Sequence, residues 1–175
     1  VFAACYGFKS VGLRYFNVFG PRQDPDGPYA SVIPAWLGAL LRGETAYVNG
    51  DGSAARDYCH VDNVVQANLL AATAEDPQAL GQAYNVAVGE QTTLNELFEI
   101  MRASLAARLP QLAQARPVHR APRRGDMLLS RADVAKAVRL LGYRPKFDLR
   151  CGLEQTIDWY IGHMLPAEQR RLAHV

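Results

Sequence analysis

The sequence predicts an α/β protein, because segments with the composition of β-strands alternate along the chain with segments that have the apolar spacing of helices. The length of 175 residues suits one domain of ordinary size, and 49% apolar with 21% charged residues is typical of a globular protein. The net charge of +2 is too small to indicate a nucleic-acid or membrane partner. No apolar run approaches the ~20 residues of a membrane span. We therefore expect neither partner.

The predicted strands are rich in branched and aromatic residues and are bounded by turn residues. The segment 49–52 (Asn-Gly-Asp-Gly) is a predicted turn that separates two of them. The predicted strands cover residues 10–19, 45–49, 56–61, 83–88 and 118–120.

The first two predicted helices have recognisable ends. The spacing predicts a helix over 31–42, with Pro34 tolerated in its first turn and Gly43 closing it. Asp62 is the predicted N-cap of an apolar helix that runs to Ala74, where Asp76-Pro77 ends it.

Two further helices are predicted from capping patterns. Thr93 and Glu96 fit a capping box for a helix that ends near Arg108. Ser130 has the position of an N-cap for a helix over 131–141, which Gly142 stops. Apolar residues at helical spacing predict a last helix over 153–164.

The cysteines and histidines do not form a metal or disulfide pattern. The three cysteines (Cys5, Cys59 and Cys151) are far apart and include no C-x-x-C pair, and the four histidines lack ligand spacing. We expect no metal. The start of the chain has no initiating Met and no basic region before an apolar stretch, so we expect no signal peptide and a cytoplasmic location.

Arginine is concentrated in residues 101–131, which hold seven arginines and a single acid, Asp126. Two interpretations stay open. The segment forms a solvated basic helix and loop, or its guanidinium groups converge on an anion such as a diphosphate.

Two motifs of dinucleotide-binding enzymes are not established in this sequence, because one lacks the structural context that it requires and the other is absent. Residues 50–55 (G-D-G-S-A-A) match the G-x-G-x-x-A fingerprint, but an extended segment follows where the fingerprint requires a helix. We interpret them as a tight turn between two strands. None of the eight tyrosines has Lys four residues later, so the Tyr-x-x-x-Lys proton-transfer pair is absent.

Four segments in order resemble the extended short-chain dehydrogenase/reductases, and most closely their UDP-N-acetylglucosamine 4-epimerases. The resemblance runs from about Tyr6 to Tyr160. The segments are G-L-R-Y-F-N-V-F-G-P-R at 12–22, G-D-G at 50–52 with R-D-Y-C-H-V-D at 56–62, Y-N-V-A-V-G at 84–89, and R-R-G-D at 123–126 with Ser130 and Ala132-Asp133.

The resemblance implies the C-terminal part of an NAD-binding, Rossmann-type enzyme. A remnant of the Rossmann sheet (about 8–20 and 62–92) would be interleaved with a small α/β subdomain that binds the sugar nucleotide (about 21–61 and 93–175). The family's Gly-rich start and Tyr-x-x-x-Lys pair are missing, which indicates a truncated chain. We expect the full-length parent to hold NAD and to form a homodimer. The chain alone should bind no NAD, should be inactive, and should self-associate.

The resemblance also implies that residues in the first part of the chain contact the sugar nucleotide or the cofactor. Asn17 would hydrogen-bond the diphosphate or the sugar, unless it is a buried cap of the strand end. The amides of Ser31 and Val32 would meet the nucleotide at a helix start. Trp36 would line the pocket or belong to the core. Tyr15 would approach the nicotinamide of the cofactor, although a core aromatic needs no such role.

The remaining implied contacts surround the nucleotide. Tyr47 and Asn49 resemble residues that bind the uracil. Arg56 and Arg123 resemble the pair that binds the diphosphate, and Asp126 resembles the ligand of the ribose.

The sugar end of the implied site is less complete. Gln23 would face the hexose. Ser130 stands where strict UDP-galactose 4-epimerases carry a bulky Tyr, so its small side chain would leave room for an N-acetyl group. Leu128 and Leu129 depart from the polar residues that are usual in the family, which leaves the identity of the sugar open.

These matches predict a UDP-N-acetylglucosamine/N-acetylgalactosamine 4-epimerase of surface-polysaccharide synthesis. Two alternatives stay open. One is another extended short-chain enzyme: a UDP-glucuronate epimerase or decarboxylase, or a dTDP-glucose dehydratase. The other is a non-catalytic nucleotide-sugar-binding fragment.

Overall fold

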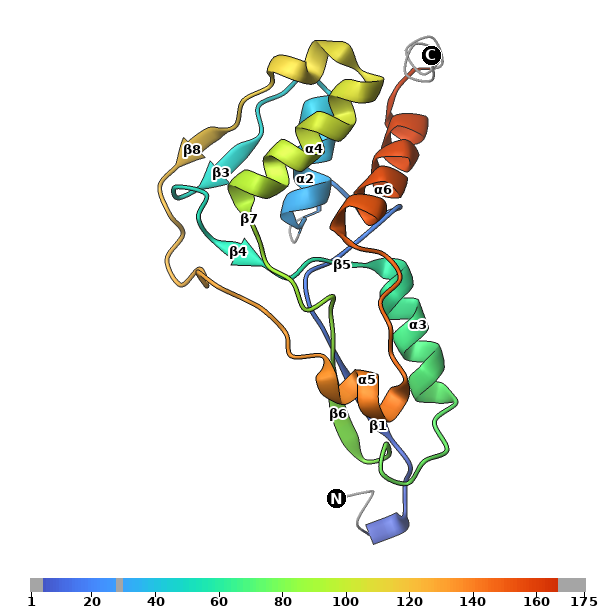
Figure 1. The fold of residues 1–175 in the computed structure, drawn as a ribbon. Coiled ribbons are helices and arrows are strands. Elements are labelled where there is room, and N and C mark those ends of the chain that lie inside the picture. Colours follow the sequence, from blue (N-terminus) through green and yellow to red (C-terminus); the bar gives the residue numbers. More distant parts are fainter. Residues whose placement is uncertain (1–4, 28–29, 167–175) are drawn as a thin grey trace.

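The computed structural model describes residues 5–27 and 30–166, and it has the predicted α/β architecture (Figure 1). The strands are β1 (Val11–Tyr15), β2 (Val18–Phe19), β3 (Tyr47–Asn49), β4 (Ala55–Arg56), β5 (Cys59–His60), β6 (Gln82–Val86), β7 (Thr92–Thr93) and β8 (Val118–Arg120). The helices are α2 (Val32–Leu41), α3 (Val61–Ala72), α4 (Leu94–Arg108), α5 (Ala135–Leu141) and α6 (Leu149–Met164), with the 3₁₀ turn η1 (Pro110–Gln114) after α4. Within these described ranges, no helix is both long and apolar enough for a membrane span.

The strands pair two by two rather than in one wide sheet. Strands β1 and β6 are parallel, with Val11 opposite Gln82 and Tyr15 opposite Val86. Strands β2 and β5 are parallel, as are β3 and β8, whereas β4 and β7 are antiparallel. The β3–β8 ribbon lies at the opposite end of the molecule from β1 and β6 (Figure 1).

Two groups of buried apolar side chains fill these ends. The larger one joins α2, α4 and α6 beneath the β3–β8 ribbon and includes Trp36, Phe98 and Tyr160. The smaller one joins α3 and α5 to β1 and β6 and includes Tyr84 and Tyr143. The division into a Rossmann remnant and a substrate-binding subdomain stays a prediction.

The single strand expected over 10–19 is wrong, because the backbone breaks at Asn17. This residue has φ of 34°, in the left-handed region that a regular strand does not contain. Upstream, β1 pairs with β6, and downstream β2 turns to β5. The strand expected over 56–61 is likewise divided into β4 and β5.

The capping box is confirmed. The Thr93 hydroxyl accepts a hydrogen bond from the amide of Glu96 at 3.1 Å, and the Glu96 carboxylate accepts one from the amide of Thr93 at 2.8 Å. Gly142 ends α5 with φ of 67°, as predicted.

Two predicted caps are wrong. The N-cap of α3 is His60, whose Nδ1 accepts from the amide of Asp62 at 3.3 Å, and Asp62 lies in the first turn, where the helix dipole favours its charge. Ser130 does not start a helix, because α5 begins only at Ala135. The amide of Ala132 is held instead by the Asp57 carboxylate at 3.2 Å, which keeps that segment out of the helix.

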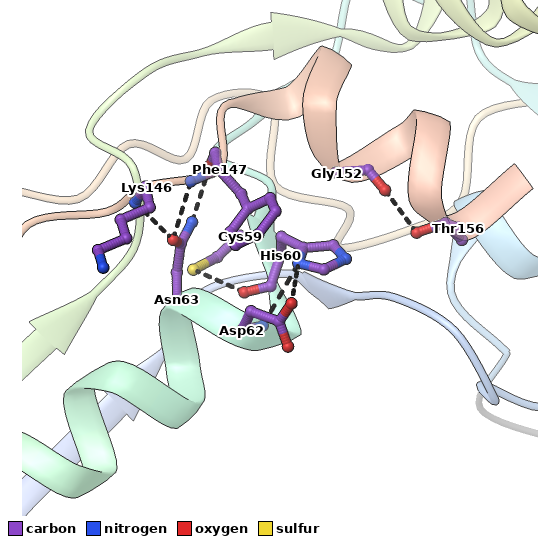
Figure 2. Close-up of polar contacts among 8 residues, drawn as sticks. All are labelled: Cys59, His60, Asp62, Asn63, Lys146, Phe147, Gly152 and Thr156. Atoms are coloured by element: carbon purple, nitrogen blue, oxygen red, sulfur yellow. Dashed lines mark hydrogen bonds and ion pairs between the residues drawn. The ribbon is translucent and has the colours of Figure 1, made fainter.

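His60 is a buried polar residue where the two groups of buried apolar side chains meet. Only 1% of it is exposed, its ring packs between Phe19 and Phe147, and Nε2 has no hydrogen-bond partner in the described part of the chain. Figure 2 shows the ring facing α6, where a Cβ at Gly152 would come within 3.0 Å of it. Burial lowers the pKa of His60.

This burial predicts acid sensitivity of folding. Because the pKa is lowered in the folded state, the unfolded chain binds the proton more readily, and stability should fall as the pH drops below the ordinary histidine value of about 6.5. His60→Asn keeps an N-cap acceptor but removes the titration. Urea unfolding at pH 7.5 and 5.0 should therefore show a smaller pH effect in this variant. The exposed His119→Asn is the control, and an equal loss of pH dependence there would contradict the assignment to His60.

Candidate functional site

A cavity of about 200 Å³ opens beside the β3–β8 ribbon and the start of α2. It is formed by segments far apart in the sequence, and it contains guanidinium, carboxylate, amide and aromatic groups. The lining residues are Asn17, Phe19, Ser31, Val32, Ile33, Trp36, Tyr47, Val48, Asn49, Arg56, Tyr58, Leu94, Arg123 and Asp126. Most of the site residues expected from the sequence are therefore brought together.

Asn17 and the start of α2 form one side. The Asn17 amide nitrogen donates to the backbone carbonyl of Asp57 at 2.9 Å, which fixes this side chain at the strand break. Ser31 is the extended N-cap of α2, and no side chain caps the helix there. The first amides of a helix lack partners within the helix, so this end of α2 is suited to an anion.

Tyr47 and Asn49 project from one face of β3, while Val48 between them is buried in the core. Trp36 lies beneath this strand. Its indole nitrogen donates to the Tyr47 carbonyl at 2.9 Å, and its ring packs edge-on against Phe98. Trp36 is thus 3% exposed and belongs to the core while it also lines the cavity, so both interpretations of this residue hold structurally.

The ion pair between Arg56 and Asp126 forms another side of the cavity. Arg56 donates to the Asp126 carboxylate at 2.8 Å and to the Leu128 carbonyl at 3.3 Å, so it ties the loop that follows β8 to β4. The arginine is 17% exposed and the aspartate 42%. Arg123, from the same loop, also lines the cavity. This arrangement places two guanidinium groups around one space.

Tyr58 is a cavity residue that the sequence analysis missed. It is 6% exposed, and its hydroxyl has no hydrogen-bond partner in the described ranges. Burial raises the pKa of Tyr58 to about 12, so the hydroxyl keeps its proton. Its spacing from Arg56 was the available signal, because residues two apart in an extended segment face the same side.

The first 87 residues match the family described as NAD dependent epimerase/dehydratase. The putative UDP-glucose 4-epimerase of Methanocaldococcus jannaschii is 32% identical over 88% of this chain and 46% of its own length. The UDP-glucose 4-epimerase of Thermotoga maritima, solved with UDP-glucose, is 38% identical with a TM-score of 0.84, over 94% of this chain and 50% of that one.

Over these 87 residues the chain is similar to the NAD-dependent epimerase/dehydratase family. A second solved relative is the UDP-N-acetylglucosamine 4-epimerase of Methanobrevibacter ruminantium, in complex with UDP-N-acetylmuramic acid. It is 36% identical with a TM-score of 0.83, over 93% of this chain and 49% of that one. The α/β fold is thus the Rossmann-like fold of UDP-sugar epimerases, and the chain spans about half the length of the relatives it matches.

The family binds NAD, but the fingerprint-like segment 50–55 does not fit the cofactor. It forms the turn between β3 and β4, and Gly50 and Gly52 have φ of 81° and 79°. Strand β4 follows, so the helix that the fingerprint requires does not begin at these glycines. The interpretation as a tight turn is confirmed. Among the residues described, no three His, Cys, Asp or Glu side chains gather as a metal site.

Three expected site residues do not line the cavity. The Gln23 amide nitrogen lies 3.4 Å from both the Val18 carbonyl and the Ser31 hydroxyl, just behind the cavity wall. The amide of Ser130 donates to the Ala55 carbonyl at 3.0 Å. Tyr15, on β1, is 50% exposed and donates its hydroxyl to Asn68 at 3.1 Å. The binding roles expected for these residues stay predictions.

The lone hydroxyl of Tyr58 gives a stability prediction. Tyr58→Phe should leave the free energy of unfolding unchanged or raise it by up to about 1 kcal/mol, because it removes a buried polar group that makes no hydrogen bond. Tyr143→Phe is the matched variant, since that buried hydroxyl donates to the Ala87 carbonyl at 2.9 Å and its loss should cost about 1 kcal/mol. Urea denaturation compares the two. Equal losses would mean that the Tyr58 hydroxyl has a partner.

Proposed function

We propose that the chain supplies the nucleotide-sugar-binding part of an NAD-dependent UDP-sugar 4-epimerase, with the cavity as the UDP-sugar site. One observation carries the proposal. The cavity gathers two guanidinium groups, a carboxylate, an unpartnered hydroxyl and a helix N-terminus, and this set of groups suits a nucleoside diphosphate.

The diphosphate would lie between Arg56, Arg123 and the start of α2. Guanidinium groups form bidentate, charge-assisted hydrogen bonds with phosphate oxygens, and the helix dipole favours negative charge at this end. Arg56 already donates to Asp126, yet a guanidinium has five N–H donors, so part of its capacity is left for a ligand. The Tyr58 hydroxyl would gain an acceptor, which removes the cost of its isolation.

The nucleoside would lie toward the β3–β8 ribbon. Tyr47 offers an aromatic surface for the base, and the Asn49 amide offers a donor and an acceptor for its edge. Asp126 accepts from Arg56 through one oxygen, and its carboxylate retains capacity to accept from ribose hydroxyls. Asn17, fixed by the Asp57 carbonyl, would meet the diphosphate or the sugar.

In the whole enzyme, bound NAD supplies the hydride chemistry at C4 of the sugar. The residues of this chain would bind and orient the substrate so that this carbon faces the cofactor, and we assign no proton-transfer group among them. Homodimerisation of the whole enzyme stays a prediction.

We further propose that the sugar is an N-acetylhexosamine and that the product serves surface-polysaccharide synthesis. The support is the small side chain of Ser130. Its backbone bond to Ala55 and the bridge between Ala55 and Leu129 hold it beside the strand that carries Arg56. The relative that acts on UDP-N-acetylglucosamine and the one solved with UDP-glucose are similarly close to this chain, at 36% and 38% identity.

The first test is nucleotide binding by calorimetry. The chain should bind UDP in preference to NAD, and Arg123→Ala should weaken UDP binding by about tenfold, the loss expected for one charge-assisted contact of about 1.5 kcal/mol. Arg139→Ala is the control, because this side chain lies on α5 at the other end of the molecule (Figure 1). NAD binding as tight as UDP binding would overturn the assignment of the cavity.

The second test concerns the sugar. Ser130→Tyr adds bulk where the acetamido group is proposed to lie, and overpacking typically costs about 1–3 kcal/mol, or roughly 5- to 150-fold in affinity. UDP-N-acetylglucosamine should therefore lose far more affinity than UDP-glucose. The measurement is the ratio of the two dissociation constants before and after the change. An unchanged ratio would remove the main support for the N-acetylhexosamine.

A further inference from the structure

The β3–β8 ribbon presents a polar, solvent-facing side next to the cavity. Parallel pairing places Tyr47 opposite Val118 and Asn49 opposite Arg120, so these four side chains share one face. Val48, on the other face, is buried in the core. The amide of Gly50 donates to the Arg120 carbonyl at 2.9 Å, which extends the pairing and fixes the arginine backbone.

On this face the guanidinium of Arg120 lies over the ring of Tyr47. The central carbon of the guanidinium is 3.1 Å from the ring centroid. Tyr47 is 41% exposed and lines the cavity, whereas Arg120 is exposed and is absent from the cavity lining in the described part of the chain. Arg120 therefore contacts the cavity only through the ring it covers.

The stack is the one interaction that engages the Arg120 side chain within residues 5–27 and 30–166. No carboxylate there lies within ion-pair distance of it, and no hydrogen bond occupies its N–H groups. By contrast, Arg102 pairs with Glu99, and Arg108 with Glu154 and Asp158. The position of the Arg120 guanidinium is thus determined by the aromatic ring.

We infer that Arg120 is a positioning residue that holds the Tyr47 ring in the orientation the base of the nucleotide requires. This inference rests on the proposed UDP-sugar site. A half-exposed tyrosine samples several rotamers, and a ligand that packs on it must order it at a cost in entropy. A planar guanidinium stacked on the ring orders it beforehand, which a lysine ammonium on a flexible stem does less well.

The test is calorimetric titration with UDP of the whole 175-residue chain and its variants. Arg120→Ala and Arg120→Lys should both weaken UDP binding by about two- to fivefold, the range expected for a cation–π contact at an exposed site. Arg124→Ala removes a nearby charge without the stack and should bind UDP as the unchanged chain does. In a Tyr47→Leu background, Arg120→Ala should have no further effect.

Each alternative gives a different result. If Arg120→Lys binds as tightly as the unchanged chain, only the charge matters and the positioning role is wrong. If Arg124→Ala loses as much affinity, or if the effect of Arg120→Ala persists with Tyr47→Leu, the role is likewise wrong. If the unchanged chain fails to bind UDP, the proposed function itself fails. Thermal melts confirm that each variant is folded, which is expected because Tyr47 and Arg120 are both exposed.

Discussion

The buried carboxylate of Asp57 is the constraint on which the site depends. It is fully buried and accepts hydrogen bonds from the amides of Val88 at 3.0 Å, Gly89 at 2.9 Å and Ala132 at 3.2 Å. Burial raises the pKa of this carboxyl, while the three amides and the nearby Arg131 charge act against that rise. The segment that holds Asp57 is therefore joined, through one side chain, to the loop at 88–89 and to the loop at 132.

The inward direction of the Asp57 side chain also determines the side on which Arg56 and Tyr58 lie. In an extended segment, alternate residues face opposite sides, so an aspartate directed inward places Arg56 and Tyr58 on the cavity side. Its carbonyl accepts from the Asn17 side chain, which is positioned by a backbone break with φ of 34°. Asp57 thus fixes two distant loops through its carboxylate, and it fixes the Asn17 side of the cavity through its backbone carbonyl.

The sequence was sufficient for elements whose signals are local. The Thr93 capping box, the Gly142 stop and the tight turn at 50–55 depend on residues within a few positions of one another, and the structure confirms them. The caps at Asp62 and Ser130 were wrong because other groups compete there, one of them near in sequence and the other distant. His60 supplies its own acceptor to α3, and Asp57, which lies 75 residues away in sequence, holds Ala132. The spacing of Tyr58 from Arg56 was a local signal for its place in the cavity, but nothing in the sequence shows that its hydroxyl is buried without a partner.

The arginines of the segment 101–131 differ in what they contact, which is why charge alone could not interpret this segment. Arg102 and Arg108, on α4, donate to carboxylates, and Arg108 joins α4 to Glu154 and Asp158 of α6. These residues stabilise the packing of helices. After β8 the single acid of the segment, Asp126, is already paired with Arg56. The diphosphate site that we propose would need uncompensated positive charge, which Arg123 at the cavity wall would supply, while Arg108 joins two of the helices behind it.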